Sequence, residues 1–180
     1  MFRWKLSLKI LGLFVLIVPV MWIVLDPNGQ RWADVNLLRL MGNPAINLDF
    51  AALNGNEDLA QLQKIYPKLE FQCEAKDGTG LNQVCYAHIA AINSLPARYL
   101  SFFLQDGRLK RIKLSYRAAY HEAFSQQLTA VYGQPGIDRK LPPANRVATW
   151  RTGPGRVVMK AQVSEQGDNQ LFWLRPGYEP

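Results

Sequence analysis

Cysteine and histidine are scarce in this chain of 180 residues, which contains two of each. The sequence also lacks a Gly-x-Ser-x-Gly nucleophile turn, a His-Glu-x-x-His helix and a glycine-rich phosphate loop. These absences argue against α/β-hydrolases, zinc proteases and nucleotide-binding enzymes. Since the residues show no catalytic constellation, we predict a non-catalytic protein with no cofactor and no metal.

N-glycosylation sequons are missing as well, because no asparagine is followed two residues later by serine or threonine. The design is compact, with one apolar segment followed by one short domain. Together these features indicate a bacterial protein.

Charge is absent from a long N-terminal stretch. The run from Ile10 to Leu25 has no charged side chain and would span roughly 24 Å as a helix. Counted from Leu6, with Lys9 reaching back to the headgroups, the segment spans roughly 30 Å, which is enough to cross a bilayer core. Pro19 is tolerable within such a helix.

The same pattern could open a cleaved signal peptide, but the residues after Leu25 fit a cleavage site poorly. Pro27 or Arg31 would occupy the position three residues before the cut, where a small residue is needed. No cysteine adjoins the run, which argues against lipid attachment. We therefore predict an uncleaved signal-anchor. Its expected membrane-interface residues are Lys5, Lys9, Trp22 and Trp32.

Basic residues set the expected orientation of this anchor. Arg3, Lys5 and Lys9 precede the run, and only Arg31 follows closely. The positive-inside rule then places the N-terminus in the cytoplasm and the C-terminal domain in the periplasm, as a single-pass protein of the bacterial inner membrane.

The exported part is mildly basic. All 14 acidic residues and 18 of the 21 basic ones follow Leu25, which gives a net charge of +4. This charge suits an acidic partner or anionic headgroups without requiring either. Nucleic acid is an improbable partner for an exported domain without a nucleic-acid motif.

Cys73 and Cys85 form an even pair in an expected oxidising compartment, which favours a disulfide that closes the Gly78/Gly80 loop. Two free buried thiols are an alternative. A metal site with His88 is another, but a structural zinc ion needs four ligands and the chain offers one further histidine.

Periodicity predicts three helices after the anchor. The first begins at the Asp26-Pro27 cap and runs to Met41, lying on the membrane surface or packed on the domain. The second is capped by Asn56 and the third covers 118–132. The residues expected to face inward are Leu59, Leu62, Ile65 and Tyr66 in the second helix and Tyr120, Phe124, Leu128 and Val131 in the third.

Strands are predicted over 69–73, 84–92, 98–105, 109–116, 147–151, 156–164 and 170–175, with a hairpin turn at Asp106-Gly107. The fold class is therefore α+β, with one transmembrane helix followed by an antiparallel sheet whose helices pack on one face. The expected parts are an anchor (1–25), a juxtamembrane helix and connector (26–56) and a periplasmic domain (57–180). The domain has possible halves, 57–116 and 117–180.

The two halves share an order of helix, tyrosine, proline and strands. The segment Leu62-Gln63-Lys64-Ile65-Tyr66-Pro67 is similar to Leu128-Thr129-Ala130-Val131-Tyr132-Gly133-Gln134-Pro135, which suggests a tandem repeat. In its element order the chain resembles small bacterial envelope proteins of the BamE-like and beta-lactamase-inhibitor-protein-like kind. That resemblance implies helices on one sheet face and a binding or assembly role through the sheet face or loops. It transfers no catalytic residue.

Basic residues are densest in the strand 109–116 and at its ends. On alternation, Arg111, Lys113 and Ser115 share one face of this strand. They form either a contact surface for a partner or headgroups, or a solvated face that also discourages edge-to-edge pairing. The candidate contact residues are Arg108, Arg111, Lys113 and Arg117, and a smaller basic group is Arg139 and Lys140.

Aromatic neighbours and histidines complete the candidate residues. Phe102 and Phe103 must face opposite ways, as must Phe172 and Trp173. A third prediction is that His121 lies on the surface at a helix start. His88, within an apolar strand, is expected to be buried or half-buried.

We expect the domain to bind another inner-membrane or periplasmic protein, as an accessory or assembly subunit or as an immunity or inhibitor protein. One alternative is an envelope enzyme acting on lipid or peptidoglycan, with His88 or His121 in a pocket beside a carboxylate. Another is a domain that binds lipid or a small ligand between sheet and helices.

Overall fold

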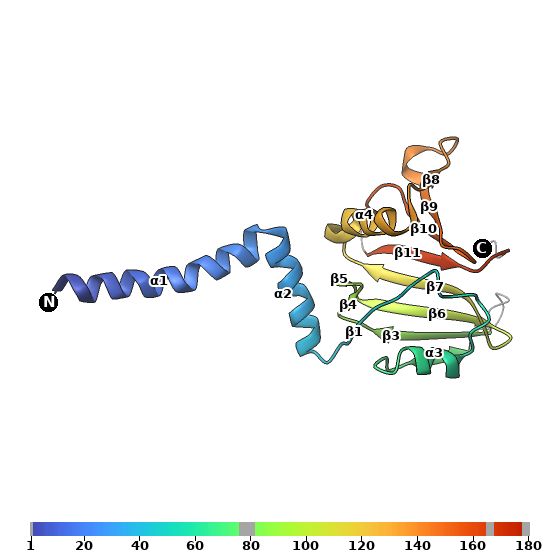
Figure 1. Cartoon of the computed structure of the whole chain (residues 1–180), viewed down its shortest axis with the longest axis horizontal. Coiled ribbons are helices and arrows are strands. Elements are labelled where there is room, and N and C mark those ends of the chain that lie inside the picture. The colour runs from blue at the N-terminus through green and yellow to red at the C-terminus, as the bar shows by residue number, and fades with distance from the viewer. Residues whose placement is uncertain (1, 76–81, 165–167, 178–180) are drawn as a thin grey trace.

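An eight-stranded antiparallel sheet organises the domain in the computed structural model, which describes residues 2–75, 82–164 and 168–177, with side chains from residue 12 onward (Figure 1). The strand order is β2-β3-β6-β7-β11-β10-β9-β8. The strands are β2 (Gln72–Ala75), β3 (Gln83–His88), β6 (Tyr99–Gln105), β7 (Arg108–Tyr116), β8 (Gly136–Ile137), β9 (Val147–Arg151), β10 (Arg156–Lys160) and β11 (Asn169–Leu174).

The order of this sheet is symmetrical about its centre. In each half the chain forms a helix and then a series of strands. The first strand of the series lies at an edge of the sheet, and each later strand lies closer to the centre, so that the last strand of each half is central. These two last strands, β7 and β11, pair over six residue pairs from Asn169↔Tyr116 to Leu174↔Arg111. The two predicted halves therefore contribute to one continuous sheet.

The core lies on one face of the sheet, beneath α3 (Leu59–Ile65), the short helix η1 (Ala118–Tyr120) and α4 (His121–Tyr132). A single cluster joins Leu62 of α3, Phe124 and Leu128 of α4 and the strand residues that point inward. The connector that follows α2 adds four buried side chains to the same cluster, and they are Ile46, Leu48, Phe50 and Leu53. Another short helix, η2 (Pro143–Asn145), lies in the loop before β9.

A second, three-stranded sheet consists of β1 (Ala45–Ile46), β4 (Ala91–Ile92) and β5 (Leu95–Pro96). The strand predicted over 84–92 is therefore wrong in its second part, because the chain leaves the large sheet after His88. The side-chain amide of Asn93, at the β4–β5 turn, pairs with the backbone of Leu48 as the backbone of a neighbouring strand would. The Asn93 side chain accepts from the Leu48 amide at 2.8 Å and donates to the Leu48 carbonyl at 2.9 Å.

Two predicted details of the helices are wrong. Asp58, and not Asn56, caps α3, because its carboxylate accepts from the Gln61 amide while the Gln61 side chain accepts from the Asp58 amide. Ile65 and Val131 were expected to face inward but are 52% and 64% exposed. Both lie near the end of their helices, where the chain turns away from the sheet.

The N-terminal helices α1 (Phe2–Leu25) and α2 (Pro27–Leu40) extend from the domain as an L (Figure 1). Within the described side chains, no single helix satisfies the length and hydropathy criteria for a membrane span. Gly12–Leu25 and α2, at 93° to each other, satisfy these criteria only as a bent pair. The side chains of Lys5 and Lys9 lie outside the described residues, so the anchor stays a prediction.

The predicted disulfide is confirmed. Cys73 and Cys85 are bonded and face each other across β2 and β3, and Cys85 is fully buried. The bond fixes an exposed edge strand to its neighbour, since the four residues of β2 are all exposed. No cysteine is free.

We predict that the Cys73→Ala/Cys85→Ala variant loses about 3 kcal/mol of unfolding free energy, because the unfolded chain is no longer closed into a loop. Urea denaturation of the oxidised wild type and of the variant measures the difference. Reduced wild type is the matched control and should resemble the variant. Equal midpoints for oxidised and reduced wild type would contradict the prediction.

Candidate functional site

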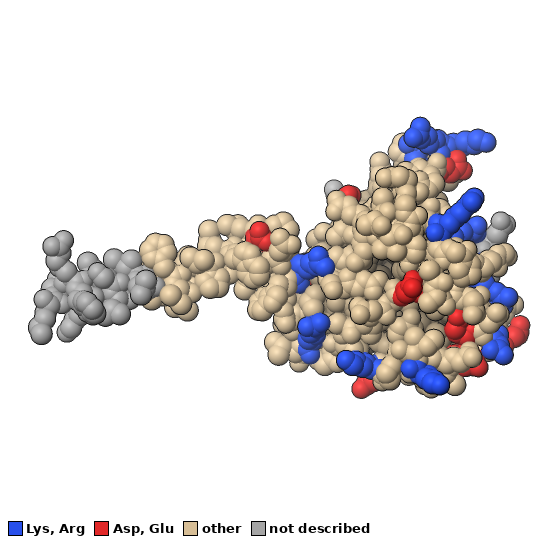
Figure 2. Space-filling view, in the orientation of Figure 1, with Lys and Arg blue, Asp and Glu red and all other residues tan. Residues whose placement is uncertain are grey.

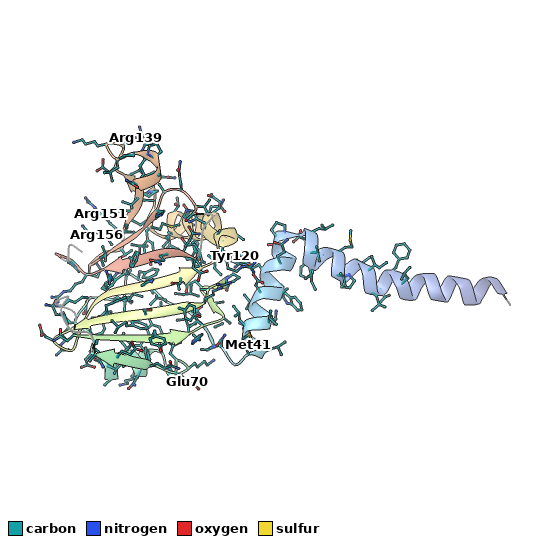
Figure 3. The ribbon with its side chains drawn as sticks, turned by 180° about the vertical axis from the view of Figure 1, so that it is seen from behind. Met41, Glu70, Tyr120, Arg139, Arg151 and Arg156 are labelled. Carbon is teal, nitrogen blue, oxygen red and sulfur yellow. A yellow bond between two sulfur atoms is a disulfide. The ribbon has the colours of Figure 1, made fainter. Side chains whose placement is uncertain are left out.

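The face of the large sheet that points away from the helices, which we call the outer face, is the candidate functional site. The predicted opposition of aromatic neighbours is confirmed: Phe102 and Trp173 are fully buried in the core, whereas Phe103 and Phe172 point to the outer face. In Figure 3 the strands lie nearest the viewer and no helix crosses them. The outer face is thus a side-chain surface on a scaffold of paired strands.

Arg111 lies at the centre of the outer face and packs against aromatic rings. Its guanidinium carbon is 4.1 Å from the ring centroid of Phe103 and 5.6 Å from that of Phe172. Contacts of this kind are worth roughly 0.5–2 kcal/mol, depending on solvent exposure. The Nε atom of Arg111 is buried and has no hydrogen-bond partner among the described residues. The aromatic rings therefore hold a cation in place without neutralising it.

Two further arginines lie in the same register row as Arg111. The pairing Arg111↔Leu174 continues as Leu174↔Arg156 and then as Arg156↔Arg151. Because directly opposed residues of antiparallel strands point to the same face, these arginines share the outer face. Arg151 and Arg156 lie close together at the end of the sheet away from α2 (Figure 3). We call Arg111, Arg156 and Arg151 the arginine row.

Lysines flank the arginine row on the same face. Lys113 lies opposite Phe172 in the next row, and Lys160 lies at the end of β10 opposite Val147. The one carboxylate that the described strands direct to the outer face is Glu74, on the edge strand β2. The half of the outer face formed by β7, β11, β10 and β9 is therefore cationic.

The four predicted contact residues are not all brought together. Arg111 and Lys113 share the outer face, but Arg108 lies at the hairpin end of β7, where it donates to the Asn56 carbonyl at 2.7 Å. Arg108 is also 3.7 Å from the Asp58 carboxylate. Arg117 lies beyond the other end of β7 and forms a 2.6 Å ion pair with Asp34 of α2. Arg108 and Arg117 thus hold neighbouring segments against the sheet.

The position of β7 in the sheet excludes one interpretation of its basic residues, namely that they protect an exposed edge. β7 pairs with β6 on one side and with β11 on the other. Because both of its edges are occupied, the cations do not serve to prevent edge-to-edge pairing of β7.

A hollow of about 420 Å³ opens beside the arginine row. Its lining includes the apolar side chains of Val147, Val158 and Phe172, and its two charged residues are Lys160 and Asp168. Asp168 forms an ion pair with Arg98 at 3.0 Å. A partner side chain with an apolar stem and a negative end would meet the apolar lining and Lys160 in this hollow.

Both histidine predictions are wrong. His121 is 7% exposed, and its Nδ1 lies 3.1 Å from the hydroxyl of the buried Tyr116. His88 ends β3 on the outer face, is exposed and contacts the ring of Tyr99 at 4.7 Å between centroids. The reversal arises because His121 begins α4 on the side that packs on the sheet, whereas His88 follows the last inward residue of its strand.

Within the described ranges, no group of three histidine, cysteine or carboxylate side chains is arranged to hold a metal ion. No protein-family model, curated protein or solved structure shows a significant match to this chain.

Sequence reasoning missed Arg151, Arg156 and Lys160 as members of the surface. They are spread over two strands and form no charge run, so composition along the chain does not reveal them. The alternation of side chains along each strand could have placed them on the outer face. Each of these basic residues is adjacent in sequence to a buried residue, Trp150, Val157 or Met159, and therefore points to the opposite face. Registering these strands with β7 additionally requires the tertiary fold.

We predict that acidification from about pH 7.5 to 5.5 destabilises the domain through His121. Burial lowers the pKa of His121 below its usual 6.5, so the unfolded chain takes up the proton more readily. The contribution is complete above the unfolded pKa, and it is lost as the pH falls from that value through the lower pKa of the folded state. Urea denaturation across this range should show a shallower pH dependence for His121→Gln than for wild type.

The matched control is His88→Gln, which removes the exposed imidazole and should retain the wild-type pH dependence. An identical pH dependence of His121→Gln and wild type would contradict the assignment to His121.

Proposed function

We propose that this protein is a membrane-anchored binding protein of the bacterial envelope whose domain engages an acidic partner protein through the outer face. The observation that carries the proposal is the arginine row, which places three guanidinium groups across β7, β10 and β9 in one register. Lys113 and Lys160 extend the positive surface.

Cationic side chains from several strands face the same way on this surface. Arg111 is held against Phe103, and Lys113 lies in the neighbouring row opposite Phe172. Guanidinium and ammonium groups form charge-assisted hydrogen bonds with carboxylates. A partner surface bearing carboxylates is thus the complement of the outer face.

The tethering part of the proposal is supported by the N-terminal sequence. The run Ile10 to Leu25 carries no charge, and α1 contains 24 residues, roughly 36 Å at 1.5 Å per residue. We infer that α1 stays in the mature protein as the anchor, with the N-terminus in the cytoplasm and the domain in the periplasm. The disulfide suits an oxidising compartment.

We propose a non-catalytic role for the same surface. The two histidines are separated in the structure, one buried against Tyr116 and one exposed beside Tyr99. The proposed activity is therefore recognition, as an accessory or assembly subunit or as an immunity or inhibitor protein.

We predict that a photo-crosslinking amino acid at Gln170 captures a protein in intact cells that express the full chain. Gln170 is exposed on the outer face beside the hollow. Lys113→Glu/Arg151→Glu should reduce the crosslinked product by about tenfold or more, equivalent to about 1.4 kcal/mol. Gel analysis and mass spectrometry quantify and identify the product.

Two controls test whether the effect belongs to the outer face. The same amino acid at Gln126, exposed on α4 over the opposite face, should not capture that partner. Arg139→Glu/Lys140→Glu makes an equal charge change in the protruding loop after β8 and should leave capture at Gln170 intact (Figure 3). Equal losses in both double variants would reduce the proposal to a nonspecific effect of net charge and overturn it.

A further inference from the structure

The joint between α1 and α2 is a defined elbow. The helices meet at 93°, with Asp26 as the single residue between them. The Asp26 carboxylate caps α2 by accepting from the amides of Asn28 at 2.8 Å and Gly29 at 3.1 Å. A Cβ atom at Gly29 would overlap the carbonyl oxygen of Trp22. The close approach of the two helices therefore requires glycine at this position.

One side of α2 is fastened to the domain. Arg31 donates twice to the Ser94 carbonyl, from Nε at 2.9 Å and from a terminal nitrogen at 2.6 Å. Asp34 accepts from Arg117 at 2.6 Å and from the Tyr120 hydroxyl at 2.5 Å. Burial, followed by the hydrogen bond to Asp34, raises the pKa of Tyr120, so this hydroxyl keeps its proton and continues to donate. α2 is thus held by the domain at two points one helical turn apart.

The opposite side of α2 carries two exposed apolar side chains. At 100° per residue, Trp32 lies about 160° from Asp34 and Leu40 lies about 180° from Arg31. Their exposed fractions are 54% and 86%. Asn36 lies between them and Arg39 beside Trp32, whereas Leu37 lines a hollow with Asp34 and so flanks the contact with the domain. Two large apolar side chains so exposed on a 14-residue helix indicate a surface with an apolar partner.

Geometry identifies that partner. α1 leaves the elbow on the uncovered side of α2, because Gly29 meets Trp22 there and the rings of Trp22 and Trp32 lie 6.1 Å apart. Figure 2 shows the uncharged surface of residues 12–25 continuing over the side of α2 that faces away from the domain, with one acidic group near the elbow. A bilayer crossed by α1 would therefore present its surface to this side of α2.

We infer that α2 is an interfacial helix that lies in the outer surface of the bilayer, with Trp32 and Leu40 at the boundary between headgroups and acyl chains. This inference rests on the proposed function, since it requires α1 to be the anchor. The sequence left two alternatives for this helix, packing on the domain or lying on the membrane. In this arrangement one side of α2 packs on the domain and the opposite side lies on the membrane.

An orientation of the domain follows. α2 touches the domain at Ser94 in the β4–β5 turn, at Arg117 directly after β7 and at Tyr120 in η1, and thus not on a face of the large sheet. The long strands extend from there away from α2, along the direction of α1 (Figure 1). The outer face therefore stands upright on the membrane, with the Asp106-Gly107 turn farthest from it.

Spin-label accessibility in the full-length protein tests the inference. The oxidised protein is reconstituted into vesicles of phosphatidylethanolamine and phosphatidylglycerol, with a single nitroxide on Leu40→Cys, Val18→Cys or Ile65→Cys. Val18 lies about two helical turns before the end of α1, and Ile65 is an exposed apolar residue on α3. Collision rates with oxygen and with a water-soluble nickel chelate report whether each label lies in lipid or in water.

The expected result is a several-fold higher ratio of oxygen to nickel collisions at Leu40 than at Ile65, with Val18 higher still. A lipid-exposed Val18 together with a Leu40 label that matches Ile65 would overturn the interfacial helix and leave the anchor standing. Labels at Val18 and Leu40 that both match Ile65 would overturn the anchor and the inference together.

Discussion

The pairing of β7 with β11 is the interaction on which the rest of the domain depends. These strands are the last in their halves, so each half becomes part of one sheet only when they meet. Their inward residues, among them Ile112, Leu114, Leu171 and Trp173, then form the middle of the core beneath α3 and α4. Their outward residues form the middle of the outer face.

The outer face illustrates how a sheet can stabilise a charged surface. Arg111 is packed on Phe103, so its aliphatic stem and planar head are ordered before any partner arrives. Such preorganisation reduces the entropy lost on binding. The segment before α3 secures the far end of this strand, because the Glu57 carbonyl accepts from the Leu109 amide at 2.8 Å.

Local signals predicted the regular elements well, and long-range contacts account for what they missed. Asp106 and Gly107 have φ values of 51° and 71°, as a tight hairpin turn of this composition requires. Local sequence likewise predicted the capped helix after Asp26 and the strand Val147–Arg151. The small sheet was not, because β1 pairs with β4 across 46 residues and each strand has two residues. The arginine row depends in the same way on registers between strands distant in the sequence.

The two free edges of the sheet are short. β8 has two residues preceded by Pro135, and the four-residue β2 is fixed to β3 by the disulfide. Short edges offer few backbone groups to an incoming strand, so extension of the sheet by another chain is disfavoured. The binding proposed for this domain would then depend on side chains rather than on backbone pairing. Single surface substitutions could accordingly change the proposed specificity while the scaffold is kept.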